Sequence, residues 1–194
     1  LLKLKELMKV VPQLRTFCHE NSCGQSAAIS TGVRMAKGKI IVTLDGDGQN
    51  DPQDISVLLK AFNENGNIKY LLVIGHRLKR LDNCVKKMSS RVANGVRSFI
   101  LGDRTPDSGC GIKVFSKNTF ISLPGFDHMH RFLPALVIRA GGKVISVPVN
   151  HRVREHGKSK YGTWHRLWVG ITDLLGVLWL RSRGSIPVVS QIKD

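Results

Sequence analysis

The feature that most constrains the fold is an apolar run followed at once by a cluster of acidic residues. Residues 39–44 read Lys-Ile-Ile-Val-Thr-Leu, a β-branched run without polar alternation. Such a run is typical of a central parallel strand that is buried on both faces. Residues 45–52, which follow directly, read Asp-Gly-Asp-Gly-Gln-Asn-Asp-Pro. Because open α/β sheets bind ligands beyond the carboxyl ends of their strands, this segment is a candidate ligand site.

Other strand and helix signals alternate around this run. A chain of 194 residues with 42% hydrophobic content can bury one core, so we expect a single globular domain. The alternation predicts an α/β sheet with helices on both faces. The expected helices are residues 1–9, 25–36, 54–63 and 86–101, and the further expected strands are residues 14–17, 70–75, 114–115 and 144–149.

The charge of the chain predicts anionic partners. Lys and Arg number 30 against 14 Asp and Glu, which gives a formal net charge of +16. Nucleic acid, phosphorylated substrates and acidic membranes all fit such a charge. The four cysteines form no CxxC pair, so reduced thiols in a cytosolic protein are expected, with a metal site at Cys18, His19 and Cys23 as the alternative.

The acidic segment has the chemistry of a metal site. Asp45 and Asp47 flank a glycine, and two carboxylates so close together are costly unless a cation offsets them. Mg²⁺ or Mn²⁺ accepts carboxylate oxygens and keeps positions for diphosphate oxygens. The alternatives are a solvent-exposed turn and a calcium loop, although Gln49 and the preceding strand depart from the calcium-loop pattern.

These residues also carry a family resemblance. Residues 45–52 resemble the D-x-D-x-Q-x-x-P segment of family-2 glycosyltransferases of the dolichyl-phosphate mannose synthase and undecaprenyl-phosphate sugar transferase type. Other segments resemble motifs of that family in the same order, across about residues 14–183. They are Asn21 to Ala28, Gly75 to Arg77, Ser90 to Asn94, Asp107 to Cys110 and Arg154 to Tyr161.

The resemblance implies a fold. It is a GT-A-like (Rossmann-like), mostly parallel sheet with helices on both faces, followed by a C-terminal amphipathic interface helix. Neither the family's V-x-I-P-x-Y-N-E segment nor its D-D-x-S segment is present, so we expect the first βαβ portion to be lacking. The implied division is a glycosyltransferase domain at 1–163, an interface helix at 164–183 and a tail at 184–194.

The resemblance also implies roles for individual residues. Asp45 would contact the donor, and Asp47 and Gln49 would bind Mg²⁺ or Mn²⁺. Asp107 is a candidate catalytic or acceptor-positioning residue, with a turn-forming role as the alternative. The remaining implied donor- and phosphate-binding residues are Asn21, Gly24, Arg77, Arg91, Arg154, Ser159 and Lys160. His130 and Arg131 could contact acceptor or sugar, or serve the structure alone.

Residues 164–183 combine tryptophan, aliphatic and arginine residues. All three tryptophans, Trp164, Trp168 and Trp179, lie here, and apolar residues of 167–180 fall at helical spacing. The apolar part, residues 167–180, is too short for a transmembrane helix, but a helix lying in a membrane interface has this composition. The alternative is an amphipathic helix that packs on the core. With the resemblance, we expect membrane contact through the three tryptophans.

The predicted function follows from the motifs together. The chain is expected to be a metal-dependent glycosyltransferase that moves a sugar from a nucleotide sugar to a polyprenyl phosphate, with undecaprenyl phosphate favoured. It would be cytoplasmic and peripheral on the inner membrane face, with an anionic membrane surface and a separate membrane protein as partners. No nucleic acid is expected, because aromatic residues do not alternate with the basic ones. The alternatives are an inactive truncated remnant and a non-enzymatic basic module that binds anionic lipid or nucleic acid.

Overall fold

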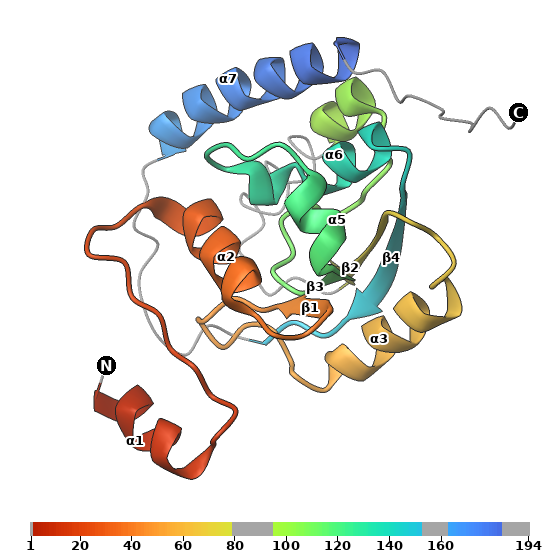
Figure 1. Cartoon of the computed structure of the whole chain (residues 1–194). Helices are drawn as coiled ribbons and strands as arrows, with labels where there is room; N and C mark the ends of the chain where they lie inside the picture. The colour runs from red at the N-terminus through yellow and green to blue at the C-terminus, as the bar shows by residue number, and fades with distance from the viewer. Residues whose placement is uncertain (1, 79–94, 153–162, 184–194) are drawn as a thin grey trace, which may run out of the picture.

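A four-stranded mixed sheet forms the centre of the molecule (Figure 1). The structure, a computed structural model, describes residues 2–78, 95–152 and 163–183, and the side chains of the last range from Val169 onward. The strands lie in the order β1-β3-β2-β4. Their bounds are β1 (Ile40–Thr43), β2 (Leu71–Arg77), β3 (Lys113–Ser116) and β4 (Lys143–Val149).

Helices cover both faces of this sheet, as predicted. The helix α3 packs on one face, and α2, α5 and α6 cover the other, with α7 packed outside α6 (Figure 1). Residues 95–101 form a further helical segment. The helix bounds are α1 (Leu2–Val10), α2 (Gly24–Met35), α3 (Asp54–Glu64), α5 (Lys117–Ser122), the 3₁₀ helix η1 (Met129–Arg131), α6 (Leu133–Arg139) and α7 (Thr163–Ser182).

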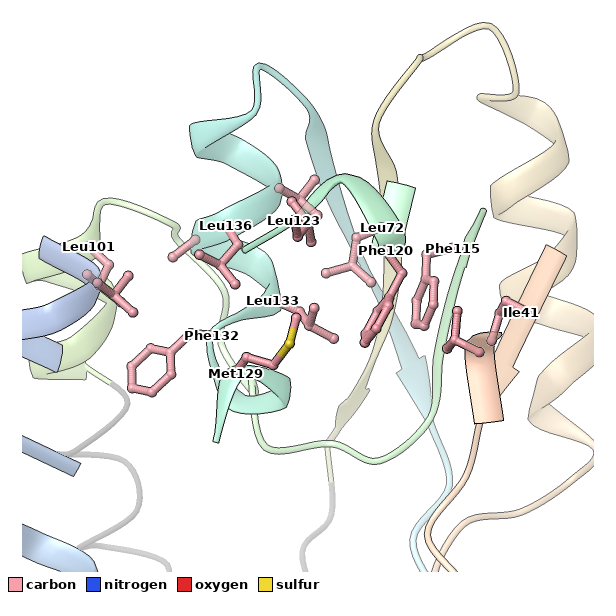
Figure 2. Packing of buried hydrophobic residues seen from close by; sticks show 14 residues of the cluster. Ile41, Leu72, Leu101, Phe115, Phe120, Leu123, Met129, Phe132, Leu133 and Leu136 are labelled. Atoms are coloured by element: carbon pink, nitrogen blue, oxygen red, sulfur yellow. The ribbon is translucent and has the colours of Figure 1, made fainter. Parts of the chain in front are cut away.

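Alternating strand residues divide the core into two clusters. Val73 and Val114 point to the α3 face, where they meet Leu58 in one buried cluster. Leu72 and Phe115 point to the opposite face and belong to a second cluster, which Figure 2 shows together with residues of η1 and α6. Each such buried side chain contributes roughly 1.5–3 kcal/mol to the free energy of folding. The period-2 pattern therefore fixes which face each helix covers.

The sheet is mixed rather than mostly parallel. β2 pairs with β4 in parallel, whereas β1 and β2 both pair antiparallel with β3. β1 is an edge strand of the described sheet with one well-buried residue, Ile41, so a central strand buried on both faces was the wrong prediction. An apolar run indicates that a strand is buried, but it does not indicate whether the neighbouring strand runs parallel or antiparallel to it. Since β3 is antiparallel to both neighbours, β1 and β2 still end at the same edge of the sheet.

The expected helices are confirmed within a few residues, but one expected strand is wrong. Residues 14–17 form no strand, and Phe17 is about half exposed. The preceding helix α1 buries none of its residues and stands away from the body (Figure 1). Of the helix expected at 86–101, the described part is residues 95–101.

An open apolar groove of about 450 Å³ lies between α2 and the outer edge of β1. Ile29 and Val33 of α2 line one side, and residues 40–44 line the other. Within the described residues, the outer backbone edge of β1 has no strand beside it. A sheet can continue at such an edge.

Candidate active site

The candidate site lies at the edge of the sheet where β1 and β2 end and β3 begins. The acidic loop, residues 45–51, follows β1, and Arg77 is the last residue of β2. Residues 107–112 lead into β3 beside them, and Thr43 Oγ1 donates a hydrogen bond to Gly111 O over 2.8 Å. The topology therefore gathers three segments that lie far apart in the sequence.

Hydrogen bonds fold the acidic loop back on itself. The Asp45 N–H donates to Asn50 Oδ1 over 2.9 Å, and the Gln49 N–H donates to Asp47 Oδ1 over 3.2 Å. Gly48 has a φ of 76°, which glycine adopts without strain. From the first turn of α2, Gln25 Nε2 donates to Asp45 Oδ1 over 3.0 Å. These contacts hold Asp45 and Asp47 in place at the carboxyl end of β1.

Gly111 is required where the acidic loop meets the start of β3. A Cβ at position 111 would collide with the Asp45 carboxylate and would lie 2.8 Å from Asn50 Oδ1. No side chain larger than hydrogen fits without displacing Asp45. The Asp45 carboxylate therefore lies directly on the backbone of the segment that leads into β3.

Arg77 and Asp107, both predicted site residues, form a bidentate ion pair. Arg77 Nε lies 2.6 Å from Asp107 Oδ2, and Arg77 Nη2 lies 2.8 Å from Asp107 Oδ1. Their side chains are 13% and 5% exposed. Both Asp107 oxygens thus engage the guanidinium, which orients the arginine. This geometry favours positioning over the proton-transfer role that the sequence left open for Asp107.

The segment after β4 is fastened to the acidic loop. Arg152 donates its backbone N–H to Gln49 O over 3.0 Å, and its Nη2 lies 2.7 Å from Asp51 Oδ2. Asn150 adds two hydrogen bonds of 2.8 Å to the Asp54 carboxylate at the start of α3. The Gln53 backbone N–H, and next the Arg152 side chain, lower the pKa of Asp51. The acidic loop therefore has a fixed position relative to β4.

Ser26, Lys113 and His130 lie near this edge, and none of them was among the predicted site residues, although a role for His130 was left open. Lys113, on β3, is 5% exposed and donates from Nζ to Cys110 O. His130 Nδ1 lies 2.7 Å from Ser26 Oγ, and the His130 N–H donates to the same oxygen over 3.2 Å. Burial lowers the pKa of His130 to about 3, so its ring is neutral. The Ser26 contact links His130 on η1 to α2, which favours a structural role for His130. For Lys113, the sequence signal that could have drawn attention to it is a lysine within the apolar run 112–115.

The other predicted donor-side residues lie at the start of α2 or outside the described residues. Gly24 begins α2 with a φ of 80°, directly before Gln25, which binds Asp45. Asn21 is exposed, and its carbonyl oxygen accepts a hydrogen bond from Cys23 Sγ. The predicted residues outside the described ranges are Arg91, Arg154, Ser159 and Lys160.

The helix α7 has two apolar faces. Val177 is fully buried, and Leu174 and Leu178 pack against the core. Ile171, Leu175 and Trp179, four residues apart, are 41%, 61% and 60% exposed. We had expected Ile171, Leu174, Leu175, Leu178 and Trp179 to share one helical face, and the structure divides them between the two faces. The side chains of Trp164 and Trp168 lie outside the described set.

Three contacts between described residues fasten α7 to the body. His128 Nδ1 lies 3.1 Å from Asp173 Oδ2, Arg139 Nε donates to Leu180 O over 2.8 Å, and Arg181 Nη1 donates to Leu101 O. Among the described residues, no helix is both long enough and apolar enough to cross a bilayer. The exposed stripe of α7 therefore lies on a helix that is anchored to the protein on its other side.

The donor set of the acidic loop fits a hard divalent cation. In the described ranges, no three His, Cys, Asp or Glu side chains gather into a complete cage. Asp45, Asp47 and Gln49 offer carboxylate and amide oxygens. Mg²⁺ and similar ions bind through one or two carboxylates and complete their coordination with water and substrate phosphates. The residues present thus suit an ion that arrives with a phosphorylated ligand.

The fold is that of GT-A glycosyltransferases. Glucosyl-3-phosphoglycerate synthase of Mycobacterium tuberculosis, crystallised with Mn²⁺, UDP-glucose and glycerol 3-phosphate, matches with a TM-score of 0.53 at 18% identity. The match covers 90% of this chain and 58% of that chain. The same enzyme crystallised with Mg²⁺ and UDP matches with a TM-score of 0.53 at 15% identity. At this identity the likeness establishes the fold alone.

The chain belongs to glycosyl transferase family 2, whose family model matches residues 3–123. Dodecaprenyl-phosphate galacturonate synthase of Rhizobium johnstonii is 34% identical over 163 residues, which are 82% of this chain and 47% of that protein. Undecaprenyl-phosphate 4-deoxy-4-formamido-L-arabinose transferase of Edwardsiella ictaluri is 32% identical over 139 residues, 72% of this chain and 42% of that protein. The chain thus spans about half the length of these relatives. The predicted family is confirmed.

Proposed function

We propose that this chain carries the catalytic site of a glycosyltransferase that moves a sugar from a nucleotide sugar to a polyprenyl phosphate. The observation that carries the proposal is the meeting of the acidic loop with the Arg77–Asp107 pair at one edge of the sheet. Carboxylates for a cation and an oriented guanidinium for phosphate are the two groups that a diphosphate leaving group needs. The relatives, named for transfer to dodecaprenyl and undecaprenyl phosphate, support the acceptor class.

In this proposal, Asp47 and Gln49 hold Mg²⁺ or Mn²⁺, and Asp45 contacts the donor. The solved neighbours with Mn²⁺ or Mg²⁺ and UDP support the choice of ion and of a nucleotide donor. When bound, the cation offsets the negative charge that develops on the leaving diphosphate. The hydrogen bonds of Gln25 and Asn50 to Asp45 position it before any ligand arrives.

Arg77, Arg91, Arg154, Ser159 and Lys160 are the proposed phosphate-binding residues. A guanidinium matches phosphate oxygens with two parallel hydrogen bonds, and Asp107 restricts the Arg77 side chain to one orientation. A phosphate oxygen of the acceptor attacks the anomeric carbon, and the bond from that carbon to the nucleoside diphosphate breaks. The acceptor phosphate is already ionised at neutral pH, so the site needs no strong general base.

The proposed place of this reaction is the inner face of the cytoplasmic membrane. The outer stripe of α7, formed by Ile171, Leu175 and Trp179, would lie in the lipid interface with the exposed Arg183 near the head groups. A net charge of +16 favours an anionic membrane surface. Trp164 and Trp168 would extend this contact. The division into a transferase domain at 1–163, an interface helix at 164–183 and a tail at 184–194 belongs to the same proposal.

A transfer assay tests this function. The chain is incubated with Mn²⁺, undecaprenyl phosphate and a panel of radiolabelled UDP- and GDP-sugars, and the label extracted into organic solvent is counted. We expect lipid-linked label with one of these donors, its loss with Asp47→Ala, and no change with Asp127→Ala, an exposed acid outside the site. Label that forms equally with Asp47→Ala would contradict the proposed metal site, and no label with any donor would contradict transfer by this chain.

A further inference from the structure

Lys113 is a buried lysine that the reaction described above does not use. It occupies the first position of the central strand β3, where its Cα partners are Thr43 of β1 and Ile74 of β2. Its side chain is on the same face of the strand as Phe115, two residues on. Lysine is almost never fully buried unless it has a partner. Its position at the carboxyl ends of β1 and β2 places it under the candidate site.

Lys113 lies beside the segment that carries Asp107 and contacts Asp45. Its Nζ donates to Cys110 O, and the next residue, Gly111, lies directly against the Asp45 carboxylate. Burial lowers the pKa of Lys113, and Arg77 lowers it further, whereas Cys110 and then the carboxylates of Asp45 and Asp107 act in the opposite direction. Among the described residues, Cys110 O is the one protein acceptor for the Lys113 side chain.

We propose that Lys113 is a positioning residue that supplies a fixed positive charge to the site, disfavouring a bare divalent cation and favouring the cation together with a nucleoside diphosphate. The inference rests on the proposed function, because it concerns the same metal and diphosphate. Because Arg77 already pairs with Asp107, the Lys113 charge acts mainly on the nearby Asp45 carboxylate while no ligand is bound. The same charge repels a lone cation and attracts the phosphates that come with it.

This arrangement predicts changes of opposite sign when the charge is removed. In Lys113→Met, the affinity for Mn²⁺ alone rises roughly three- to tenfold, since a nearby positive charge has gone. At saturating Mn²⁺, the affinity for UDP or inorganic pyrophosphate falls by a similar factor. A purely structural role of Lys113 would lower both affinities together, because a disordered site binds neither ligand well.

Calorimetric titration of the whole chain with Mn²⁺, and with UDP, GDP or pyrophosphate at saturating Mn²⁺, measures both affinities. Lys113→Gln keeps a donor for Cys110 O without the charge and should behave as Lys113→Met does, and Lys113→Arg should stay close to the parent. The control Lys143→Met removes a charge at the first residue of β4, beside the start of β2 and away from the candidate site. It should change neither affinity. Circular dichroism identifies a variant that does not fold, in which case the other neutral variant is used.

The outcomes separate this inference from the proposed function. Opposite changes in the two neutral variants, absent in Lys143→Met, are the expected result. Parallel losses, or unchanged affinities, overturn the role of Lys113 and leave the metal–diphosphate site standing. If the parent chain binds neither Mn²⁺ nor any diphosphate with Mn²⁺, the site itself is wrong and both proposals fall.

Discussion

Asp107 holds the guanidinium of Arg77 through both of its carboxylate oxygens, at 2.6 and 2.8 Å. The pair joins the end of β2 to the segment that precedes β3, and both side chains are largely buried. A charge that loses its buried partner is strongly destabilising, whereas removal of the whole pair costs less. The pair can therefore be tested for both its stability and its orienting role.

Asp107→Asn should lower the free energy of unfolding by about 3–5 kcal/mol, because it removes the buried carboxylate charge that faces the Arg77 guanidinium. The double variant Arg77→Met/Asp107→Leu should lose less free energy of unfolding than Arg77→Met and Asp107→Leu lose together as single variants. The reason is that the two residues are in direct contact. Urea denaturation followed by circular dichroism measures both values. Strict additivity of the single changes would contradict the coupling.

Gly111→Ala should impair the acidic loop without unfolding the chain. The added methyl group collides with the Asp45 carboxylate and must displace it, at a cost of about 1–3 kcal/mol. Metal-dependent binding of UDP should weaken by roughly tenfold or more, which corresponds to at least about 1.4 kcal/mol. Gly125→Ala, whose methyl group would meet no atom within 4 Å, is the matched control. Equal binding by both variants would show that the position of Asp45 does not matter.

Acid should destabilise the chain through His130. Its pKa of about 3 in the folded chain lies below the 6.5 of an ordinary histidine, so the unfolded state binds the proton more tightly. The neutral ring stabilises the fold above pH 6.5, and that contribution is lost as the pH falls toward 3. By pH 4 the loss reaches at most about 3 kcal/mol. Asp51, whose pKa is also lowered, acts with the same sign but at lower pH, below its usual value of 3.8.

Denaturation curves between pH 7 and pH 4 test this effect. His130→Asn should show a flatter dependence of the free energy of unfolding on pH than the parent chain. The control is His76→Asn, which changes a partly exposed histidine on β2. A control variant that flattens the curve as much as His130→Asn would assign the effect to other groups.

The outer stripe of α7 should bind membranes. Leu175→Ser and Trp179→Ser each remove one exposed apolar side chain, worth about 1–2 kcal/mol of interface burial. Co-sedimentation with phosphatidylglycerol-rich vesicles should then weaken by roughly tenfold for each variant. Val57→Ser changes an equally exposed apolar residue on α3 and should bind as the parent does. If vesicle binding weakens with added salt but is unchanged in both α7 variants, the chain is held by electrostatic attraction alone. That result would contradict the apolar contact proposed for α7.

Local patterns were sufficient to predict the elements but not their pairing. The apolar run 39–44 predicted a strand and the ligand site after it, and both the strand and the family are confirmed. Its edge position and antiparallel neighbour could not be predicted, because β3 comes from residues more than sixty positions away. Residues 14–17 have strand propensity, but in the described structure they have no strand to pair with.

The same distinction applies to the site. Asp45 and Asp47 lie two residues apart in the sequence, so the acidic loop was recognisable, and the motif order suggested Arg77 and Asp107. That Asp107 binds Arg77 depends on contact across thirty residues. The burial of Lys113 depends on two flanking strands, and α7 needed a core on one side before its outer face could be identified.

The central claim is that the acidic loop binds a divalent cation together with a nucleoside diphosphate. The most direct measurement is calorimetric titration of UDP and GDP into the chain with and without Mn²⁺, repeated with Asp47→Ala. The account predicts binding that requires Mn²⁺ in the parent chain and is lost in Asp47→Ala, while Asp127→Ala binds normally. Binding that ignores Mn²⁺, or that survives in Asp47→Ala, would contradict it.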